Sequence, residues 1–177
     1  MLSGGRLIVG VGAGYLEPEL TAIGVPMDGR GARTDEYLAA MRALWEDAKP
    51  EFAGEHVGFT GVDAHPRPVQ RPLPVVVGGH SAPAWRRAAH SGQGWYGYMR
   101  PPEDIARQVA GLRTAEASIG RDHRLHVSVT PDCRLDAESV AAYAAAGVDR
   151  LVVAPRPDAD VAALRRWLER NAPAADS

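Results

Sequence analysis

Short β-branched runs alternate along this chain with longer stretches whose apolar residues recur at helical spacing, and this alternation constrains the fold more than any other feature. The runs predict five strands, at residues 7–11, 74–77, 94–98, 125–129 and 150–154. The longer stretches predict helices at residues 29–47, 83–90, 102–119, 136–146 and 158–171. Strands separated by helices pair in parallel, because each connecting helix has to cross over the sheet. The sequence therefore predicts an α/β fold with about five parallel strands and outer helices.

Several residues at the ends of the expected helices support these limits. Pro102 fits the first turn of a helix, where its missing N–H is not needed. The side chains of Asp136 and Asp158 are expected to accept hydrogen bonds from free amides at two helix starts, and Gly147 is expected to end a helix. The last two strand–helix units repeat at a spacing near the ~30 residues of a βαβ unit, which favours a parallel sheet.

One segment interrupts the alternation. Residues 52–62 read FAGEHVGFTGV, in which apolar residues alternate and three glycines are internal. This pattern predicts a β-hairpin over about residues 50–64, inserted between a helix and the next strand. With 177 residues, 45% of them apolar, the chain is expected to bury one core. We therefore predict a single domain over residues 1–177 that carries the hairpin as an insertion.

Composition and charge argue against several classes of function. The net charge of −2 provides no basic face for nucleic acid, and no apolar run reaches the ~20 residues of a membrane helix. Cys133 is the only cysteine, which excludes an internal disulfide, predicts a small buried thiol and suits a reducing cytoplasm. His123 and His126 lack the carboxylate or cysteine partners that would complete a metal site. We expect a cytoplasmic protein without a metal, a membrane segment or a nucleic-acid partner.

The segment VVVGGHSAPAW places Gly78, Gly79, His80 and Ser81 between an expected strand and an expected helix. Function gathers at the carboxyl ends of parallel strands, and the first turn of a helix presents free amides and a partial positive charge. Glycines let the backbone approach a ligand closely, and Ser81 adds a hydroxyl group. These residues predict a cradle for an anion such as a phosphate. The alternative is that the glycines only turn the chain and Ser81 only caps the helix.

The first expected strand ends in a similar way, in Gly12, Ala13, Gly14 and Tyr15. This is not a dinucleotide fingerprint, because G-x-G-x-x-G requires a glycine at Tyr15 and the LEPEL that follows is a weak helix opening. Glycine here still allows a flat ligand to lie against the backbone. A tight turn without a ligand is the alternative.

Other side chains near these loops also allow two interpretations. His80 can donate a hydrogen bond to a phosphate or face solvent. Arg86 and Arg87 form a solvated helix face or reach an acidic cofactor tail. Trp95, Tyr96 and Tyr98 either pack within the sheet or line a flavin pocket.

Two long segments carry a resemblance to a known family. The stretch LSGGRLIVGVGAGYLEPELTAIGVPMDGRGARTDEYLAAMRALW, followed by the hairpin and PVQRPLPVVVGGHSAPAWRRAAHSGQGWY, resembles the luciferase-like monooxygenase superfamily and its coenzyme F420-dependent branch. The resemblance covers nearly the whole chain, and the linked order of the motifs makes it specific.

The resemblance implies a TIM (β/α)8 barrel that holds a deazaflavin or FMN at the carboxyl ends of its strands, with an insertion that matches the hairpin. It implies that Gly78, Gly79, His80 and Ser81 receive the cofactor phosphate. It implies that Gly12, Ala13, Gly14 and Tyr15 lie near the ring system. Coenzyme F420 is the expected cofactor, and FMN is the alternative.

Two departures from the family pattern limit what is carried over. A closed barrel needs eight strands and about 250 residues, whereas five strands are expected here. The chain resembles the C-terminal part of the family without its first three βα units, so we expect an incomplete barrel of the bacterial-luciferase type and no catalytic acid or base can be assigned. The sugar-phosphate dehydrogenases of the family carry a glutamate where this chain has Tyr15, which argues against that substrate class.

Two functions follow as hypotheses. The first is an F420- or FMN-dependent oxidoreductase that acts on a small organic substrate. The second is a truncated, non-catalytic member that binds a cofactor or serves as a partner subunit. The exposed apolar edge of an open sheet favours pairing with another chain, so we expect a homo-oligomer or a complementing chain that covers this edge.

Overall fold

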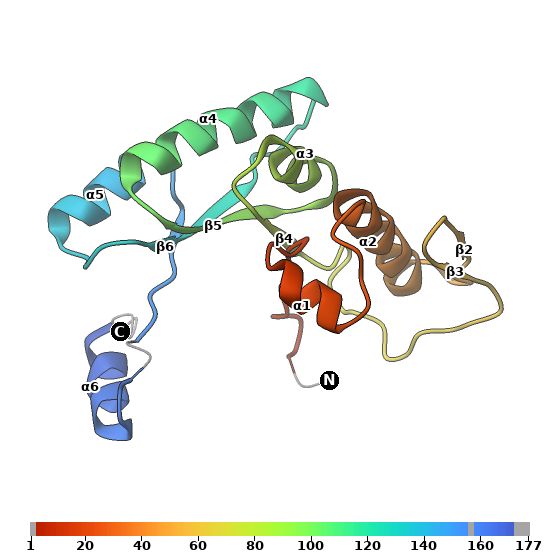
Figure 1. The fold of residues 1–177 in the computed structure, drawn as a ribbon, viewed down its shortest axis with the longest axis horizontal. Coiled ribbons are helices and arrows are strands. Elements are labelled where there is room, and N and C mark those ends of the chain that lie inside the picture. Colours follow the sequence, from red (N-terminus) through yellow and green to blue (C-terminus); the bar gives the residue numbers. More distant parts are fainter. Residues whose placement is uncertain (1–2, 156–157, 172–177) are drawn as a thin grey trace.

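A parallel five-stranded sheet forms the centre of the protein. The computed structural model describes residues 3–155 and 158–171. Its strands are β1 (Val9–Val11), β4 (Val75–Gly78), β5 (Gly94–Arg100), β6 (His126–Pro131) and β7 (Arg150–Leu151), and they lie side by side in that order. Every pair is parallel, and the expected α/β architecture is confirmed (Figure 1).

The register of the strands gives the sheet two different faces. Val77 is paired with Val11 on one side and with Trp95 on the other, and Trp95 is paired with Val127. Because side chains alternate along a strand, the residues of this row point to the same face of the sheet. All of them except the half-buried Val11 are fully buried, so this is the face of the sheet against which the core packs.

The described residues form six helices, which are α1 (Glu17–Ala22), α2 (Arg30–Glu46), α3 (Ala82–Ser91), α4 (Pro102–Ser118), α5 (Ala137–Ala145) and α6 (Val161–Asn171). Helices α3, α4 and α5 lie on one side of the sheet, whereas α6 lies on the other side (Figure 1). The core forms between the sheet and helices α2, α3, α4 and α5. Its largest fully buried side chains are those of Trp95, Tyr143, Leu38, Ile105 and Leu112.

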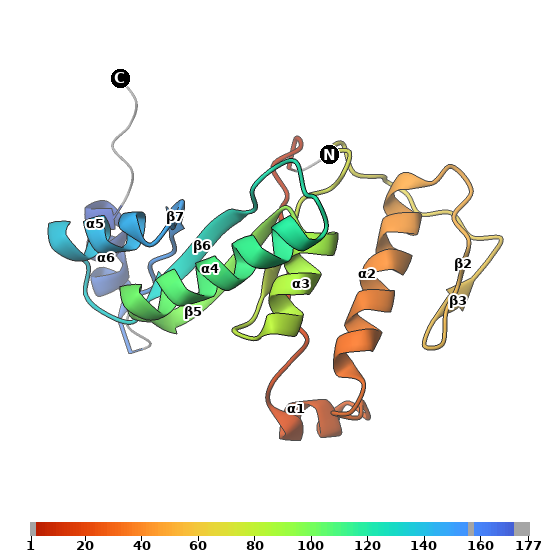
Figure 2. The same cartoon turned by 90° about the horizontal axis from the view of Figure 1, so that it is seen from above.

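The expected hairpin is present as β2 (Phe52–Ala53) and β3 (Gly58–Phe59), which are antiparallel. It lies beside α2, at the opposite end of the molecule from α5 (Figure 2). An isolated two-stranded hairpin is only marginally stable in water. Here the carboxylate of Glu36 on α2 accepts hydrogen bonds from the backbone amides of Glu55, His56 and Val57, at 2.7–3.0 Å. This contact fastens the tip of the hairpin to the helix.

Three of the four expected helix boundaries are confirmed. Pro102 is the first residue of α4. Asp136 and Ser139 form a reciprocal capping box at the start of α5, with both bonds at 2.8 Å. Gly147 follows the end of α5 with φ +87°, a conformation that glycine adopts without strain. The prediction for Asp158 is wrong, because α6 begins later and Asp160 accepts the hydrogen bond from the amide of Ala163 at 2.7 Å.

Three further features differ from the expectation. The LEPEL segment does open a helix, the six-residue α1, whose first turn contains Pro18. Strand β7 is only two residues long, because pairing with β6 ends at Leu151. Cys133 is exposed, since it lies in the loop after β6 and not within a strand or helix that packs on the core.

The sheet does not close into a barrel. The strand order ends at β1 and β7, which are not paired with each other. Next to the β1 edge, Leu7 is 50% exposed and Ile8 is 46% exposed. The expectation of an incomplete barrel with an apolar open edge is therefore confirmed.

Candidate functional site

The pairing of β1 with β4 brings the two glycine-containing loops together. Val11 and Val77 are partners in parallel strands, so the loops that follow them leave the sheet at the same edge. A Cβ atom placed on Gly78 would lie only 3.7 Å from the carbonyl oxygen of Val11. Residues predicted from separate parts of the sequence thus form one candidate site, as parallel-sheet geometry requires.

Gly79 occupies a backbone position that no other residue fits. Its φ is +131°, and an added Cβ would lie 2.8 Å from the Cβ of Ala84 on α3. Its carbonyl oxygen accepts a hydrogen bond of 2.8 Å from the indole N–H of Trp95, a fully buried residue of β5. The loop is therefore packed against α3 and tied to the core, so its backbone is held ready for a close contact.

The start of α3 presents unused hydrogen-bond donors. Ser81 is the residue that precedes the helix, but its side chain makes no capping bond. In the part of the chain that the structure describes, the amides of Ala82 and Ala84 have no hydrogen-bond partner. Free amides at a helix start attract anions, because the helix dipole adds a partial positive charge there. The alternative in which Ser81 caps the helix is not observed.

His80 is exposed, but its ring is held from several sides. Its Nδ1 lies 2.7 Å from Oε1 of Gln108 on α4, and its Nε2 accepts a hydrogen bond of 3.4 Å from the amide of Tyr98. The ring also meets Trp95 edge-on, with 6.3 Å between the ring centroids. This histidine thus has a defined orientation at the carboxyl ends of β4 and β5.

The loop formed by Gly12, Ala13, Gly14 and Tyr15 is more open. Nothing lies within 4 Å of a Cβ placed on Gly12, and the side chain of Tyr15 is 80% exposed. Gly14 has φ +78°, and its carbonyl oxygen accepts a hydrogen bond of 3.1 Å from Nε of Arg30. The start of α2 therefore holds this loop in place, while its outer surface stays free.

Sequence reasoning missed the role of Arg87. The side chain was expected on a solvated face or near a cofactor tail, but Arg87 is only 7% exposed and both interpretations are wrong for it. It donates to the carboxylate of Asp35 at 2.5 and 3.1 Å and to the carbonyl oxygen of Gly31 at 2.8 Å. Arg86, the preceding residue, is exposed as expected.

A strained backbone position at the end of β5 was also missed. Met99 has φ +47°, and the register with β6 shifts between Tyr98 and Arg100. Such irregularities in a strand occur often beside functional sites, where they redirect side chains. Methionine carries no sequence signal for this conformation, so only the structure reveals it.

The aromatic residues of β5 divide between the two expected roles. Trp95 is fully buried and packs in the core, whereas Tyr98 is 54% exposed at the end of the strand. Tyr96 is half-buried on the face of the sheet opposite Trp95, and its hydroxyl lies 2.6 Å from that of Thr130 on β6.

Tyr143 of α5 joins the ends of β5 and β6. Its hydroxyl donates to the carbonyl oxygen of Arg100 at 2.8 Å and lies 3.2 Å from the carboxylate of Asp132. Burial raises the pKa of Tyr143 well above its ordinary value, so this residue stays a hydrogen-bond donor.

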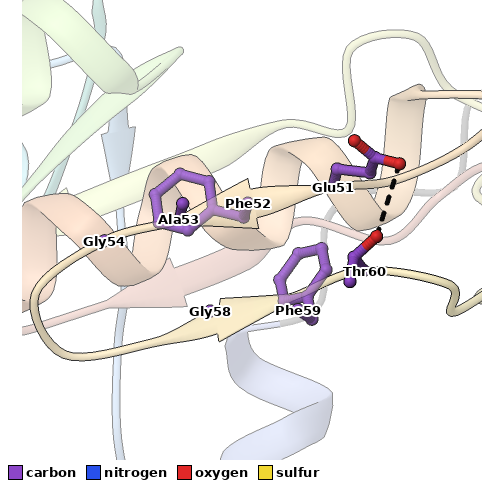
Figure 3. Close-up of a pocket in the computed structure, with 7 residues that line it drawn as sticks. All are labelled: Glu51, Phe52, Ala53, Gly54, Gly58, Phe59 and Thr60. Carbon is purple, nitrogen blue, oxygen red and sulfur yellow. Dashed lines mark hydrogen bonds between the residues drawn. The ribbon is translucent and has the colours of Figure 1, made fainter.

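A further hollow lies elsewhere, on the hairpin. It is an open concavity of about 730 Å³, lined by Glu51, Phe52, Ala53, Gly54, Gly58, Phe59 and Thr60 (Figure 3). The rings of Phe52 and Phe59 stack with centroids 6.1 Å apart, and Thr60 donates to Glu51 at 3.4 Å. This surface is wide and open and carries one carboxylate. The carboxyl ends of β1 and β4 are therefore the better candidate for a ligand-binding or catalytic site.

Two negative findings concern only the described residues. They contain no group of three or more histidine, cysteine, aspartate or glutamate residues that could hold a metal ion. None of their helices is both long enough and apolar enough to cross a membrane.

Residues 1–176 match the family of luciferase-like monooxygenases. The chain belongs to this family. An uncharacterised protein of Mycobacterium tuberculosis is 37% identical over 173 residues, which make up 97% of this chain and 60% of the relative. An FMNH2-dependent dimethylsulfone monooxygenase of Pseudomonas putida is 30% identical over 154 residues, covering 83% of this chain and 42% of the relative. This family member therefore spans 60% of the length of the first of these curated relatives and 42% of the second.

A solved structure supports the same architecture. An F420-dependent secondary alcohol dehydrogenase, in complex with an F420-acetone adduct, superposes with a TM-score of 0.74 over 86% of this chain and 64% of its own. The two sequences are only 16% identical, so this likeness concerns the fold. Membership of the luciferase-like monooxygenase family is thus shown for this chain, and the proteins that it resembles include an FMNH2-dependent and an F420-dependent enzyme.

Proposed function

We propose that this chain provides the cofactor-phosphate half of a flavin- or deazaflavin-dependent oxidoreductase site. The observation that carries the proposal is the meeting of two glycine loops at the ends of β1 and β4, beside unused donors at the start of α3. Coenzyme F420 is the cofactor that we favour, with FMN as the alternative. Both carry an anionic phosphate and a flat ring system, the two groups that these loops suit.

The residues of the two loops suit both the phosphate and the ring system of such a cofactor. Gly79 keeps the backbone free of a side chain where a phosphate approaches, and Trp95 holds the Gly79 carbonyl so that the loop keeps its shape. The Ser81 hydroxyl and the amide of Ala82 can then donate to phosphate oxygens. Gly12 leaves an open surface on which a ring can lie. When bound, the cofactor supplies the hydride or oxygen chemistry, and the protein binds, orients and shields it.

The substrate of this reaction is proposed to be a small organic molecule. The carboxyl ends of the strands offer polar groups such as those of Tyr98 and Asp132, but none of them is assigned as an acid or base. The single cysteine, exposed and unpaired, suits a reducing compartment, and we infer a cytoplasmic location from it.

The alternative is a non-catalytic cofactor-binding subunit. The open edge of β1 and the exposed side chains of Leu7 and Ile8 favour this alternative, because they leave the sheet unfinished. We propose that a further parallel strand covers this edge. Strand–helix units of the kind found in longer relatives are the occupant that we favour, on this polypeptide or on another.

The test is a titration of the purified protein with coenzyme F420 and separately with FMN, following fluorescence and melting temperature. Saturable binding with a rise in melting temperature supports the proposal, because a ligand selective for the folded state stabilises it. Gly79→Ala is expected to weaken binding at least about tenfold, since its methyl group collides with Ala84.

Gly120→Ala is the matched control, because Gly120 also has a positive φ (+64°) but follows the carboxyl end of α4, where nothing lies within 4 Å of its Cβ. The control is expected to bind as the unchanged protein does. Equal affinity in Gly79→Ala would remove the phosphate site from this loop. Turnover that appears only when strand–helix units complete the sheet would identify the chain as one part of a shared active site.

A further inference from the structure

His80 lies between a side chain on one helix and a backbone amide on a neighbouring strand. Nδ1 is 2.7 Å from Oε1 of Gln108, which lies in the second turn of α4. Nε2 is 3.4 Å from the amide nitrogen of Tyr98 near the end of β5. The two contacts join three elements, since His80 itself follows β4.

This arrangement defines where the proton of the neutral ring lies. A backbone N–H can only donate, so Nε2 has to be the unprotonated nitrogen that accepts from Tyr98. The proton of the neutral ring is then on Nδ1, and Gln108 has to present its carbonyl oxygen to receive it. The amide of Tyr98 lies next to the irregular end of β5, where Met99 has φ +47°.

The two bonds differ in strength. The bond to Gln108 is short and stays intact whether His80 is neutral or charged, because Nδ1 donates in both forms. The bond from Tyr98 is long, and it is lost when Nε2 takes up a proton. Nε2 is therefore the atom at which the charge of His80 changes, and a protonated Nε2 is a new donor on the residue that precedes Ser81.

We propose that Gln108 is a positioning residue that holds the ring and the Nδ1 proton of His80, so that Nε2 becomes protonated when an anionic group enters the loop. This inference rests on the proposed function and adds a regulation to it, namely anion binding linked to the uptake of one proton. The group that is recognised is a phosphate, supplied by a cofactor or by inorganic phosphate. The link predicts that affinity falls as the pH rises through the titration of His80.

The charged groups on the surrounding elements are few. The first turn of α4 carries Glu103 and Asp104, and Asp104 is already paired with Arg107. On β5, Arg100 ends the strand. The first turn of α3 carries no charged side chain. His80 is therefore the titratable group of the cradle itself.

The first experiment follows the protein with 15N-labelled histidine by NMR. The unchanged protein is expected to show neutral His80 with its proton on Nδ1, which is the less common form in free histidine. Gln108→Leu removes the acceptor, and His80 is then expected to move to the form with the proton on Nε2. Gln108→Glu keeps an acceptor on a side chain of the same length, so it is expected to retain the Nδ1–H form.

The second experiment measures the binding of inorganic phosphate, FMN and coenzyme F420 between about pH 5.5 and 8.5, the range in which histidine titrates. In the unchanged protein, the affinity for phosphate is expected to fall by up to about tenfold per pH unit above the midpoint of His80, the limit for one linked proton. Bound phosphate is expected to raise that midpoint, and Gln108→Leu to flatten the pH profile.

The outcomes separate this inference from the proposed function. A proton on Nε2 in the unchanged protein, or a ligand that binds without moving the titration of His80, overturns the inference and leaves cofactor binding standing. Failure of FMN and F420 to bind, while phosphate still moves the titration of His80, overturns the proposed function alone. If phosphate leaves the titration of His80 unchanged, the inference fails.

Discussion

The guanidinium group of Arg87 on α3 lies 2.5 Å from the carboxylate of Asp35 on α2, measured from Nε to Oδ1. The same guanidinium donates to the carbonyl oxygen of Gly31, and the neighbouring Arg30 donates to that of Gly14. The first turns of α2 thus connect the loop after β1 to the helix after β4. The two halves of the candidate site are held in a fixed relation through arginine contacts to backbone oxygens.

Replacement of Arg87 is expected to destabilise the protein. Arg87→Ala leaves the Gly31 carbonyl without its partner and removes a charge-assisted contact, so we expect the free energy of unfolding to fall by about 1–3 kcal/mol. Urea denaturation measures this change. The control Arg86→Ala alters an exposed neighbour and is expected to stay within about 0.5 kcal/mol of the unchanged protein. Equal losses in both variants would contradict the role assigned to Arg87.

The hairpin is expected to loosen in acid because its anchor is a carboxylate. Burial by itself would raise the pKa of Glu36, but hydrogen bonds from the amides of His56, Val57 and Glu55 outweigh it and lower the pKa below its ordinary value of 4.5. The ionised form is thus favoured in the folded state. The stabilisation is complete above pH 4.5 and is lost as the pH falls through the lowered pKa.

Amide hydrogen exchange at residues 55–57 measures this loss. Glu36→Gln is expected to speed exchange at these amides at neutral pH, because the amide side chain offers one acceptor oxygen in place of two. Glu55→Gln changes a carboxylate at the hairpin tip itself and is expected to leave exchange at His56 and Val57 as it is. If exchange does not respond to Glu36→Gln, the hairpin tip is stabilised by contacts other than those with the Glu36 carboxylate.

The indole N–H of Trp95 is expected to contribute to stability, and a second tryptophan offers a matched control. Trp95→Phe leaves the carbonyl oxygen of Gly79 unpaired, whereas Trp85→Phe removes a buried N–H that has no partner among the described residues. The free energy of unfolding should therefore fall by about 1–2 kcal/mol more for Trp95→Phe than for Trp85→Phe. Thermal or urea denaturation of both variants gives the comparison, and no difference would mean that the Gly79 loop is held by packing alone.

The apolar edge beside β1 is expected to make the isolated protein self-associate. Exposed Leu7 and Ile8 precede β1, whose outer edge has no partner among the described residues and is therefore a template for pairing with another chain. Light scattering after size-exclusion chromatography should show a mass that rises with concentration, and Ile8→Lys should reduce it. Ile119→Lys changes an equally exposed isoleucine after α4 and should have little effect. A monomer at every concentration would contradict the prediction.

Local patterns in the sequence predicted most of the fold. Each strand of the five-stranded sheet begins or ends within a few residues of its expected position, because β-branched runs and helical spacing are properties of neighbouring residues. The capping box of Asp136 was found for the same reason, since its partner Ser139 is three residues away. Asp158 shows the limit of this reasoning, because two aspartates precede α6 and either could cap it. In the structure the helix begins at Val161, so Asp160 and not Asp158 accepts the hydrogen bond from the amide of Ala163.

The sequence by itself determined that glycine loops follow the first two expected strands of the sheet and that the sheet lacks the strands of a closed barrel. Only the tertiary structure decided what holds those loops: Arg87 reaches Asp35 across 52 residues, and His80 reaches Gln108 across 28. It also decided that Cys133 is exposed and that Met99 is strained. The physical reason is that periodicity and capping act between near neighbours, whereas these contacts depend on how the helices pack over the sheet.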